Sequence, residues 1–258
     1  MKARLATLAA GAVSVAVLLA IWQVICALGV VSADYLPPPT RVATALVELA
    51  REGSLVHDNL LTMSRALGGL IAATILGVGM AAVTTRYRKG ALAFDPVAEF
   101  IRPLPPAAII PLSIFVFGLR WQLYAFIVTF ACFWPIYLNA ARAMHASSRL
   151  QVQTARSFGV DGWALLGQVQ LVAALPEIFI GIRQAGAVSL VATIVTEMLA
   201  GQNGIGFLIT DASMTLQVPE TFAGLVVIMA DGVLLDAAIM ALRRRFVAWH
   251  DGMNAVRT

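Results

Sequence analysis

Residues 153–176 read QTARSFGVDGWALLGQVQLVAALP and form a polar segment between two long apolar stretches. The sequence up to Phe158 is typical of a helix, and Gly159 is expected to end it, because glycine readily adopts the left-handed backbone that closes a helix. Asp161 can then cap a second short helix over residues 162–169 by accepting hydrogen bonds from free backbone N–H groups. The pattern therefore predicts two short helices joined at Gly159.

The second of these helices is expected to have one apolar face. Trp163, Leu166 and Val169 recur at i, i+3 and i+6, which is the spacing of a single apolar stripe. The rest of the chain offers little polar surface, so a polar protrusion with an apolar stripe indicates a docking surface for a soluble partner. We therefore expect the remaining chain to hold the polar segment at one face of a membrane.

The composition is that of a membrane protein. Of the 258 residues, 60% are hydrophobic and 12% are charged, whereas a soluble domain has about 25% charged residues. The length fits a single transmembrane domain over residues 1–258, embedded in a lipid bilayer, and the net charge of +4 does not indicate a nucleic acid partner. Cys26 and Cys132 lie in apolar runs without His or Cys neighbours, so neither a disulfide nor a metal site is expected.

Long apolar runs predict an all-α polytopic protein with about six transmembrane helices, since about 20 apolar residues cross a bilayer. The expected spans cover residues 5–33, 59–85, 91–119, 121–141, 178–200 and 221–242. Basic clusters remain cytoplasmic. With six spans, the clusters at 86–89 and 243–245 lie on one side and both termini are cytoplasmic, whereas five spans would place 243–245 outside. A signal peptide cleaved after Ala33 is the alternative for the first run, which is longer than a signal core of about 7–15 residues.

The third expected span is interrupted by proline. Its prolines are Pro96, Pro103, Pro105, Pro106 and Pro111. Proline removes a backbone donor and kinks a helix, and in a membrane the freed carbonyl groups need protein or water as partners. Residues 102–111 are therefore expected to be bent backbone that either packs between helices or lines a transport path. Arg102 and Pro105 are the candidate path residues here.

Charged side chains within the spans are further candidates for a solute path. Each costs about 2.5–3.5 kcal/mol on insertion scales and therefore usually faces protein or water. Glu197, Asp231 and Asp236 lie in the last two spans, and each can line a path or make a structural hydrogen bond or ion pair. Arg183 precedes Glu197 by 14 residues, or about 21 Å along a helix, so the two cannot pair. Arg183 is expected to be an interface anchor or the partner of a helix end.

The sequence contains no motif of an enzyme active site. No glycine-rich loop is followed by Lys-Ser or Lys-Thr, so no phosphate cradle for ATP is predicted. His57, His145 and His250 lack metal-ligand spacing. No catalytic, cofactor or metal site is therefore expected, and uphill transport driven by ATP would need a separate ATPase.

Residues 153–159 together with Leu175-Pro176 resemble the EAA loop of the inner-membrane permeases of bacterial ABC importers, in which a short coupling helix follows the loop. Flanking motifs are similar to those of the nitrate/sulfonate/taurine-type branch and extend the resemblance over roughly residues 36–249. These motifs are at 36–39, 102–105, 111–112, 117–118, 181–183, 197–198 and 204–206. Two positions depart from the family. Gln153 replaces Glu, which weakens a charge-based contact, and Val172 replaces the first of two prolines, which relaxes a helix break.

The resemblance implies a type I importer permease of the bacterial inner membrane, with two copies forming a homodimer. It implies ATP-binding cassette ATPase subunits and a soluble or lipid-anchored substrate-binding protein as partners, and a small organic or inorganic anion as solute. The residues that would contact the ATPase are Gln153, Ala155, Gly159, Asp161, Trp163 and Leu166. Two alternatives stay open: an ion-coupled secondary transporter using Asp231, Asp236 or Glu197, and a membrane anchor without a transport path.

Overall fold

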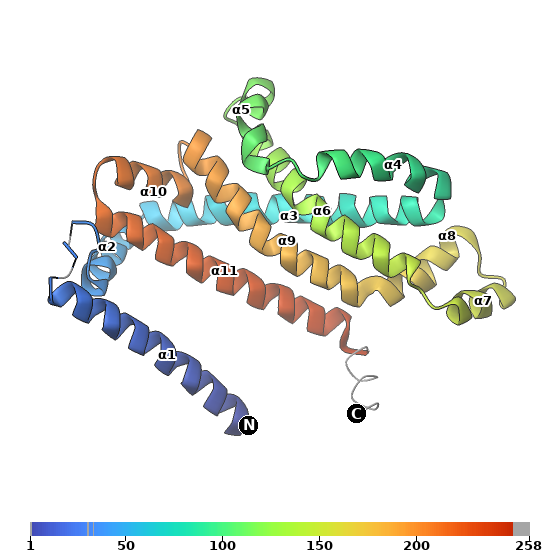
Figure 1. Cartoon of the computed structure of the whole chain (residues 1–258), viewed down its shortest axis with the longest axis horizontal. Helices are drawn as coiled ribbons and strands as arrows, with labels where there is room; N and C mark the ends of the chain where they lie inside the picture. The colour runs from blue at the N-terminus through green and yellow to red at the C-terminus, as the bar shows by residue number, and fades with distance from the viewer. Residues whose placement is uncertain (1, 30, 33, 250–258) are drawn as a thin grey trace.

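The computed structural model describes residues 2–29, 31–32 and 34–249, and every regular element within these ranges is helical, as predicted. Long helices run along the longest axis of the molecule, with short helices at its two ends (Figure 1). In chain order the elements are α1 (Lys2–Ala27), α2 (Pro39–Glu52), α3 (Ser54–Arg86), α4 (Arg88–Ile101), α5 (Pro106–Phe117), α6 (Trp121–His145), α7 (Arg149–Ser157), α8 (Gly162–Leu165), a π-helical turn η1 (Leu166–Gln170), α9 (Leu171–Ala200), α10 (Ile205–Met214) and α11 (Val218–Phe246).

Four helical stretches of the described chain are each long and apolar enough to cross a membrane. They are α3, α6, the continuous helix 162–200 and α11. Residues 92–101 and α5 pass this test only as a pair, which makes up to five candidate spans within the described residues. The first expected span corresponds to α1, of which only Val13–Ala27 enters the test. The prediction of a polytopic helical membrane protein is confirmed, while Met1, Ala33 and the C-terminal residues 250–258 lie outside the described residues.

The third and fifth spans differ most from simple straight helices. The predicted interruption of the third span is confirmed, because the chain bends by 97° between α4 and α5. The fifth span begins earlier than the predicted residue 178, since α9 starts at Leu171 and contains Pro176. A local π-helical adjustment can satisfy backbone groups near a proline in a membrane helix, and η1 lies directly before α9.

The centre of the molecule is built from α3, α6 and α9. On α3, a Cβ added at Gly69 would overlap Val128 of α6, and one at Gly77 would lie 3.1 Å from Ile136 Cγ2. In lipid, helix association relies on close van der Waals packing, which small residues allow. Gly69 and Gly77 therefore let α3 pack closely against α6.

The two ends of the molecule have different structures. At one end, Val42 of α2 shares a buried cluster with Ala223 of α11, and Leu55 of α3 shares another with Ile205 of α10. At the other end, the short helices α7 and α8 project beside the turn that joins α3 to α4 (Figure 1). The fold thus holds the polar segment at one end and the turn between α9 and α10 at the other.

Candidate functional site

The polar segment begins with α7, which ends at Ser157. Gly159 has a left-handed backbone (φ +78°), and the N–H of Val160 donates to the carbonyl of Ala155 at 3.0 Å. This is the glycine stop that the sequence predicts. Gln153 is exposed on α7, while Ala155 is half-buried.

Asp161 stands directly before α8, but its carboxylate makes no capping hydrogen bond. Its Oδ1 lies instead 3.3 Å from the Nε of Arg156, in an exposed ion pair. The predicted side-chain cap is therefore wrong, because Arg156 holds the carboxylate away from the helix start. The ion pair connects α7 to α8 across Gly159.

The second helix of the polar segment is not the separate element predicted over residues 162–169. α8 leads into η1, where the N–H of Leu171 donates to the carbonyl of Leu166, and η1 leads directly into α9. Residues 162–200 consequently form one continuous helix of 39 residues. A displacement of α8 would therefore be carried straight into a membrane-spanning helix.

The apolar side chains of the polar segment differ in their burial. Leu166 is buried, whereas Trp163 is 51% exposed and Phe158 is 82% exposed. The predicted apolar stripe is therefore not one continuous exposed face, because Leu166 is enclosed by protein while Trp163 stays exposed. The Trp163 ring packs edge-on against Tyr87, with ring centroids 6.0 Å apart. Leu166 thus anchors the segment, and Trp163 and Phe158 offer apolar surface.

A buried ion pair lies at the other end of α9. Glu197 is fully buried, and its carboxylate accepts hydrogen bonds from Arg65 Nη1 at 2.6 Å and Thr62 Oγ1 at 2.9 Å. The N–H of Gly206 donates to the same carboxylate at 3.0 Å. The guanidinium of Arg65 lies over the Tyr124 ring, 3.9 Å from its centroid. Helices α3, α6, α9 and α10 therefore meet at Glu197, a pairing that sequence reasoning missed.

The glycine-rich turn between α9 and α10 wraps around this carboxylate. Gly204 has φ +103°, and a Cβ there would overlap the carboxyl group of Glu197. The N–H of Gly204 donates to Asp58 Oδ1 at 2.9 Å, and the N–H of Ile205 donates to Thr62 Oγ1 at 2.9 Å. These bonds satisfy two of the N–H groups that are free at the start of a helix. They tie the start of α10 to α3.

The two acids of α11 have different surroundings. Asp231 is buried and accepts a hydrogen bond from Asn59 Nδ2 at 3.3 Å. Asp236 is half-exposed and pairs with Arg183 of α9 through two bonds, Nε to Oδ1 at 2.6 Å and Nη2 to Oδ2 at 3.0 Å. Arg183 thus partners a side chain of the neighbouring helix, where the sequence suggested an interface anchor or a helix end.

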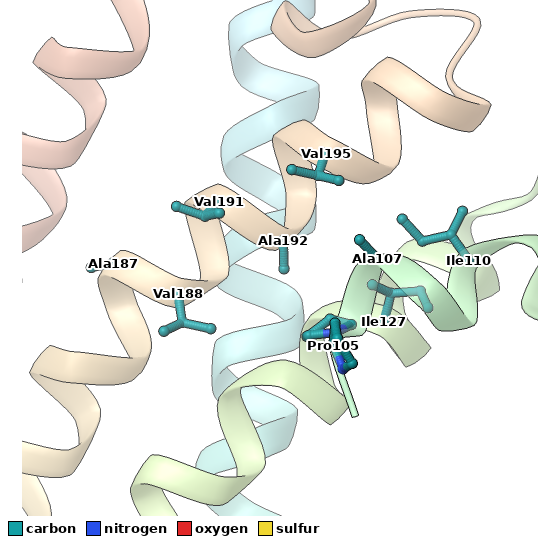
Figure 2. A pocket seen from close by; sticks show the side chains of 10 residues that line it. Pro105, Ala107, Ile110, Ile127, Ala187, Val188, Val191, Ala192 and Val195 are labelled. Carbon is teal, nitrogen blue, oxygen red and sulfur yellow. The ribbon is translucent and has the colours of Figure 1, made fainter. Parts of the chain in front are cut away.

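The break between α4 and α5 borders a cavity. Pro105 lines an apolar cavity of about 350 Å³ together with residues of α5, α6 and α9, among them Ala187 and Val191 (Figure 2). Arg102 is exposed at the same break. Of the four candidate path residues, Pro105 and Arg102 are therefore accessible, whereas Glu197 and Asp231 are enclosed by protein. Within the described residues, no group of three His, Cys, Asp or Glu side chains could hold a metal ion.

Comparison with known proteins connects this arrangement to transport. Residues 73–248 match the family described as "Binding-protein-dependent transport system inner membrane component". A taurine transport system permease protein of Escherichia coli is 31% identical, covering 92% of this chain and 88% of its own. A putative aliphatic sulfonates transport permease protein of Bacillus subtilis is 30% identical, covering 92% and 86%. A bicarbonate transport system permease protein of Synechococcus elongatus is 30% identical, covering 90% and 84%.

Proposed function

The chain belongs to the family of inner membrane components of binding-protein-dependent transport systems, and from this premise we propose that it is the permease subunit of an ATP-driven importer of a small anion. The observation that carries the proposal is the continuous helix 162–200. It joins an exposed docking surface to a transmembrane span without a break. Such a helix can pass the movement of a soluble motor protein to the membrane-embedded part of the molecule.

The motor would be a separate ATP-binding cassette ATPase that receives α8 in a surface groove. Trp163 and Phe158 supply exposed apolar surface for this contact, Gln153 and the Arg156–Asp161 pair supply polar surface, and Gly159 sets the angle between α7 and α8. Closure of two ATPase subunits on ATP would push α8 along the axis of α9. The edge-on packing of Trp163 on Tyr87 carries the same push to the α3–α4 turn.

Two copies of the chain would enclose the solute path, and a soluble or lipid-anchored binding protein would deliver solute at the end formed by α2 and α10. A small anion is proposed because the relatives are named for aliphatic sulfonates, taurine and bicarbonate. Both chain ends would be cytoplasmic, because clusters of Lys and Arg favour that side of the membrane.

The four candidate path residues would act in two ways. Pro105 and Arg102 lie at the broken helix, where backbone without a regular helix is tolerated only beside a cavity or inside protein. Glu197 and Asp231 would meet solute only when α9 and α11 move away from α3, because both carboxylates bond to α3 in this conformation. Glu197 would then serve as a gate that holds α3, α9 and α10 together.

The test is a pair of substitutions in the docking surface, Trp163→Asp and Gly159→Arg, in the permease expressed with its ATPase and binding protein. We expect at least a tenfold loss of transport and of binding-protein-stimulated ATP hydrolysis, with normal membrane insertion, because a buried charge or a bulky cation would obstruct the apolar contact. Phe246→Asp is the matched control, since Phe246 is an exposed aromatic residue at the end of α11, outside the polar segment and away from the end proposed to meet the binding protein. Normal transport by both variants, or transport without any ATPase, would refute the proposal.

A further inference from the structure

An ion pair is exposed on the surface of two apolar helices. Arg183 and Asp236 are joined by two hydrogen bonds, yet their side chains remain 55% and 45% exposed. The other ion pair within the candidate spans of the described chain, Arg65 with Glu197, is enclosed, with exposures of 14% and 0%. The Arg183–Asp236 pair therefore needs surroundings that this single chain does not provide.

The pair lies inside the thickness of the membrane. Asp236 precedes the basic cluster Arg243-Arg244-Arg245 by seven residues, or about 10 Å along α11. The hydrocarbon core is about 30 Å thick, so a membrane surface at the basic cluster places Asp236 well within it. Charged side chains at such depth face protein or a water-filled cavity rather than lipid.

The surface around the pair is hollow. Gly186 and Gly232 lack side chains and border a cavity of about 80 Å³ that Arg183 and Asp236 line. Ala187 borders this cavity and also the larger apolar cavity that reaches the broken helix at Pro105 (Figure 2). One uncovered face of α9 thus runs from the ion pair to the helix break.

We propose that the Arg183–Asp236 ion pair faces the water-filled passage through which the solute crosses the membrane, and that it forms the charged part of the passage wall. The proposal rests on the proposed function only in assuming that this protein encloses a passage. Water would hydrate the exposed edges of both side chains. A hydrophilic solute would meet fixed charge of both signs at this depth and apolar surface at the cavity near Pro105.

The test uses position 187 as a reporter, because Ala187 is exposed one helical turn from Arg183. Ala187→Cys is introduced into a chain carrying Cys26→Ser and Cys132→Ala, so that it supplies a single thiol, and the permease is studied in membrane vesicles of both orientations. Small anionic and cationic thiosulfonates, which react in water, serve as probes.

The matched control is Leu234→Cys in the same background. Leu234 is 64% exposed and lies two residues before Asp236, which places it on the opposite side of α11. We expect the thiol of the Ala187→Cys variant to react at least about tenfold faster than that of the Leu234→Cys variant, because thiols facing lipid are protected from these reagents.

The charge of the pair is then tested in the same reporter chain. Arg183→Gln should lower the ratio of anionic to cationic reaction rates by about threefold or more, and Asp236→Asn should raise it by a similar factor, because each change leaves one uncompensated charge near the thiol. Only variants that elute as a single species of normal size are compared.

An unreactive thiol at position 187, equal rates at positions 187 and 234, or a ratio that neither substitution changes would overturn the inference. No ATPase takes part in this labelling. The labelling test can therefore fail while the Trp163→Asp test succeeds, or succeed while the Trp163→Asp test fails. Failure of this inference is thus distinguishable from failure of the proposed function.

Discussion

At the scale of single residues, removing one partner of the enclosed ion pair of Arg65 and Glu197 is expected to be strongly destabilising. Arg65→Gln would leave a buried carboxylate without its charge partner, and breaking a buried pair in this way costs about 3–5 kcal/mol. Thr62 and the N–H of Gly206 would still donate to Glu197 but would not neutralise it. We expect a clear drop in the midpoint of thermal unfolding in detergent, followed by tryptophan fluorescence.

The matched comparison is Arg156→Gln, which removes the same type of charge from an exposed pair. The side chains of Arg156 and Asp161 are 61% and 68% exposed, so water compensates for the lost partner. The unfolding midpoint of this variant should stay close to that of the parent chain. Equal losses in the two variants would show that burial of Glu197 does not determine the strength of its ion pair.

Residue-level sequence reasoning succeeded where the chemistry is local. Gly159 has the left-handed backbone that its position after a polar helix predicts. The side chain of Asp161 was misassigned because Arg156, five positions earlier, competes for its carboxylate. The pairing of Arg65 with Glu197 spans 132 positions, and one sequence offers no signal for it beyond the presence of charged residues in both spans.

At the scale of helices, the contact between α3 and α6 depends on the absence of a side chain at Gly69. A Cβ there would overlap Val128, and the backbone N of Thr129 lies 3.3 Å away. Gly69→Ala should therefore lower stability by about 1–3 kcal/mol through overpacking. The expected readout is a lower unfolding midpoint and a smaller yield of monodisperse protein in detergent.

The neighbouring glycine offers a direct control. Apart from the adjoining residues and backbone of α3 itself, no atom lies within 4 Å of a Cβ built at Gly68. Alanine also favours a helix by about 1 kcal/mol over glycine, so Gly68→Ala should be neutral or slightly stabilising. A loss at Gly68 as large as at Gly69 would mean that helix propensity or lipid contact, and not the packing of α3 on α6, governs this face.

The lengths of the apolar runs predicted the positions of the membrane-spanning helices more reliably than they predicted where one helix joins the next. The second, fourth and sixth spans were expected close to where α3, α6 and α11 lie, since run length and composition determine membrane insertion. The proline cluster likewise located the break between α4 and α5. The continuity of α8 with α9 was missed because the π-helical turn at Leu166–Gln170 is too short to produce a recognisable hydrophobic periodicity in the sequence.

At the scale of the whole molecule, the helix ends next to the polar segment carry several basic residues. Arg86 ends α3, Arg142 lies in the last turn of α6, and the polar segment with Arg156 follows beside them. The turn between α10 and α11 lies at the opposite end (Figure 1). Because Lys and Arg clusters favour the cytoplasmic side, this distribution is consistent with the orientation that the proposed function needs.

The orientation predicts which cysteine variants a membrane-impermeant maleimide can label in intact cells. In the chain without native cysteines, Gln217→Cys should be labelled from outside, because Gln217 is exposed in the turn before α11. Trp163→Cys should be labelled only after permeabilisation, since the polar segment lies among the basic residues at the other end. Denatured samples labelled in parallel give the maximum signal for each variant and correct for expression. Labelling of the Trp163→Cys variant in intact cells would place the docking surface outside, where no ATPase could reach it, and would invert the proposed arrangement.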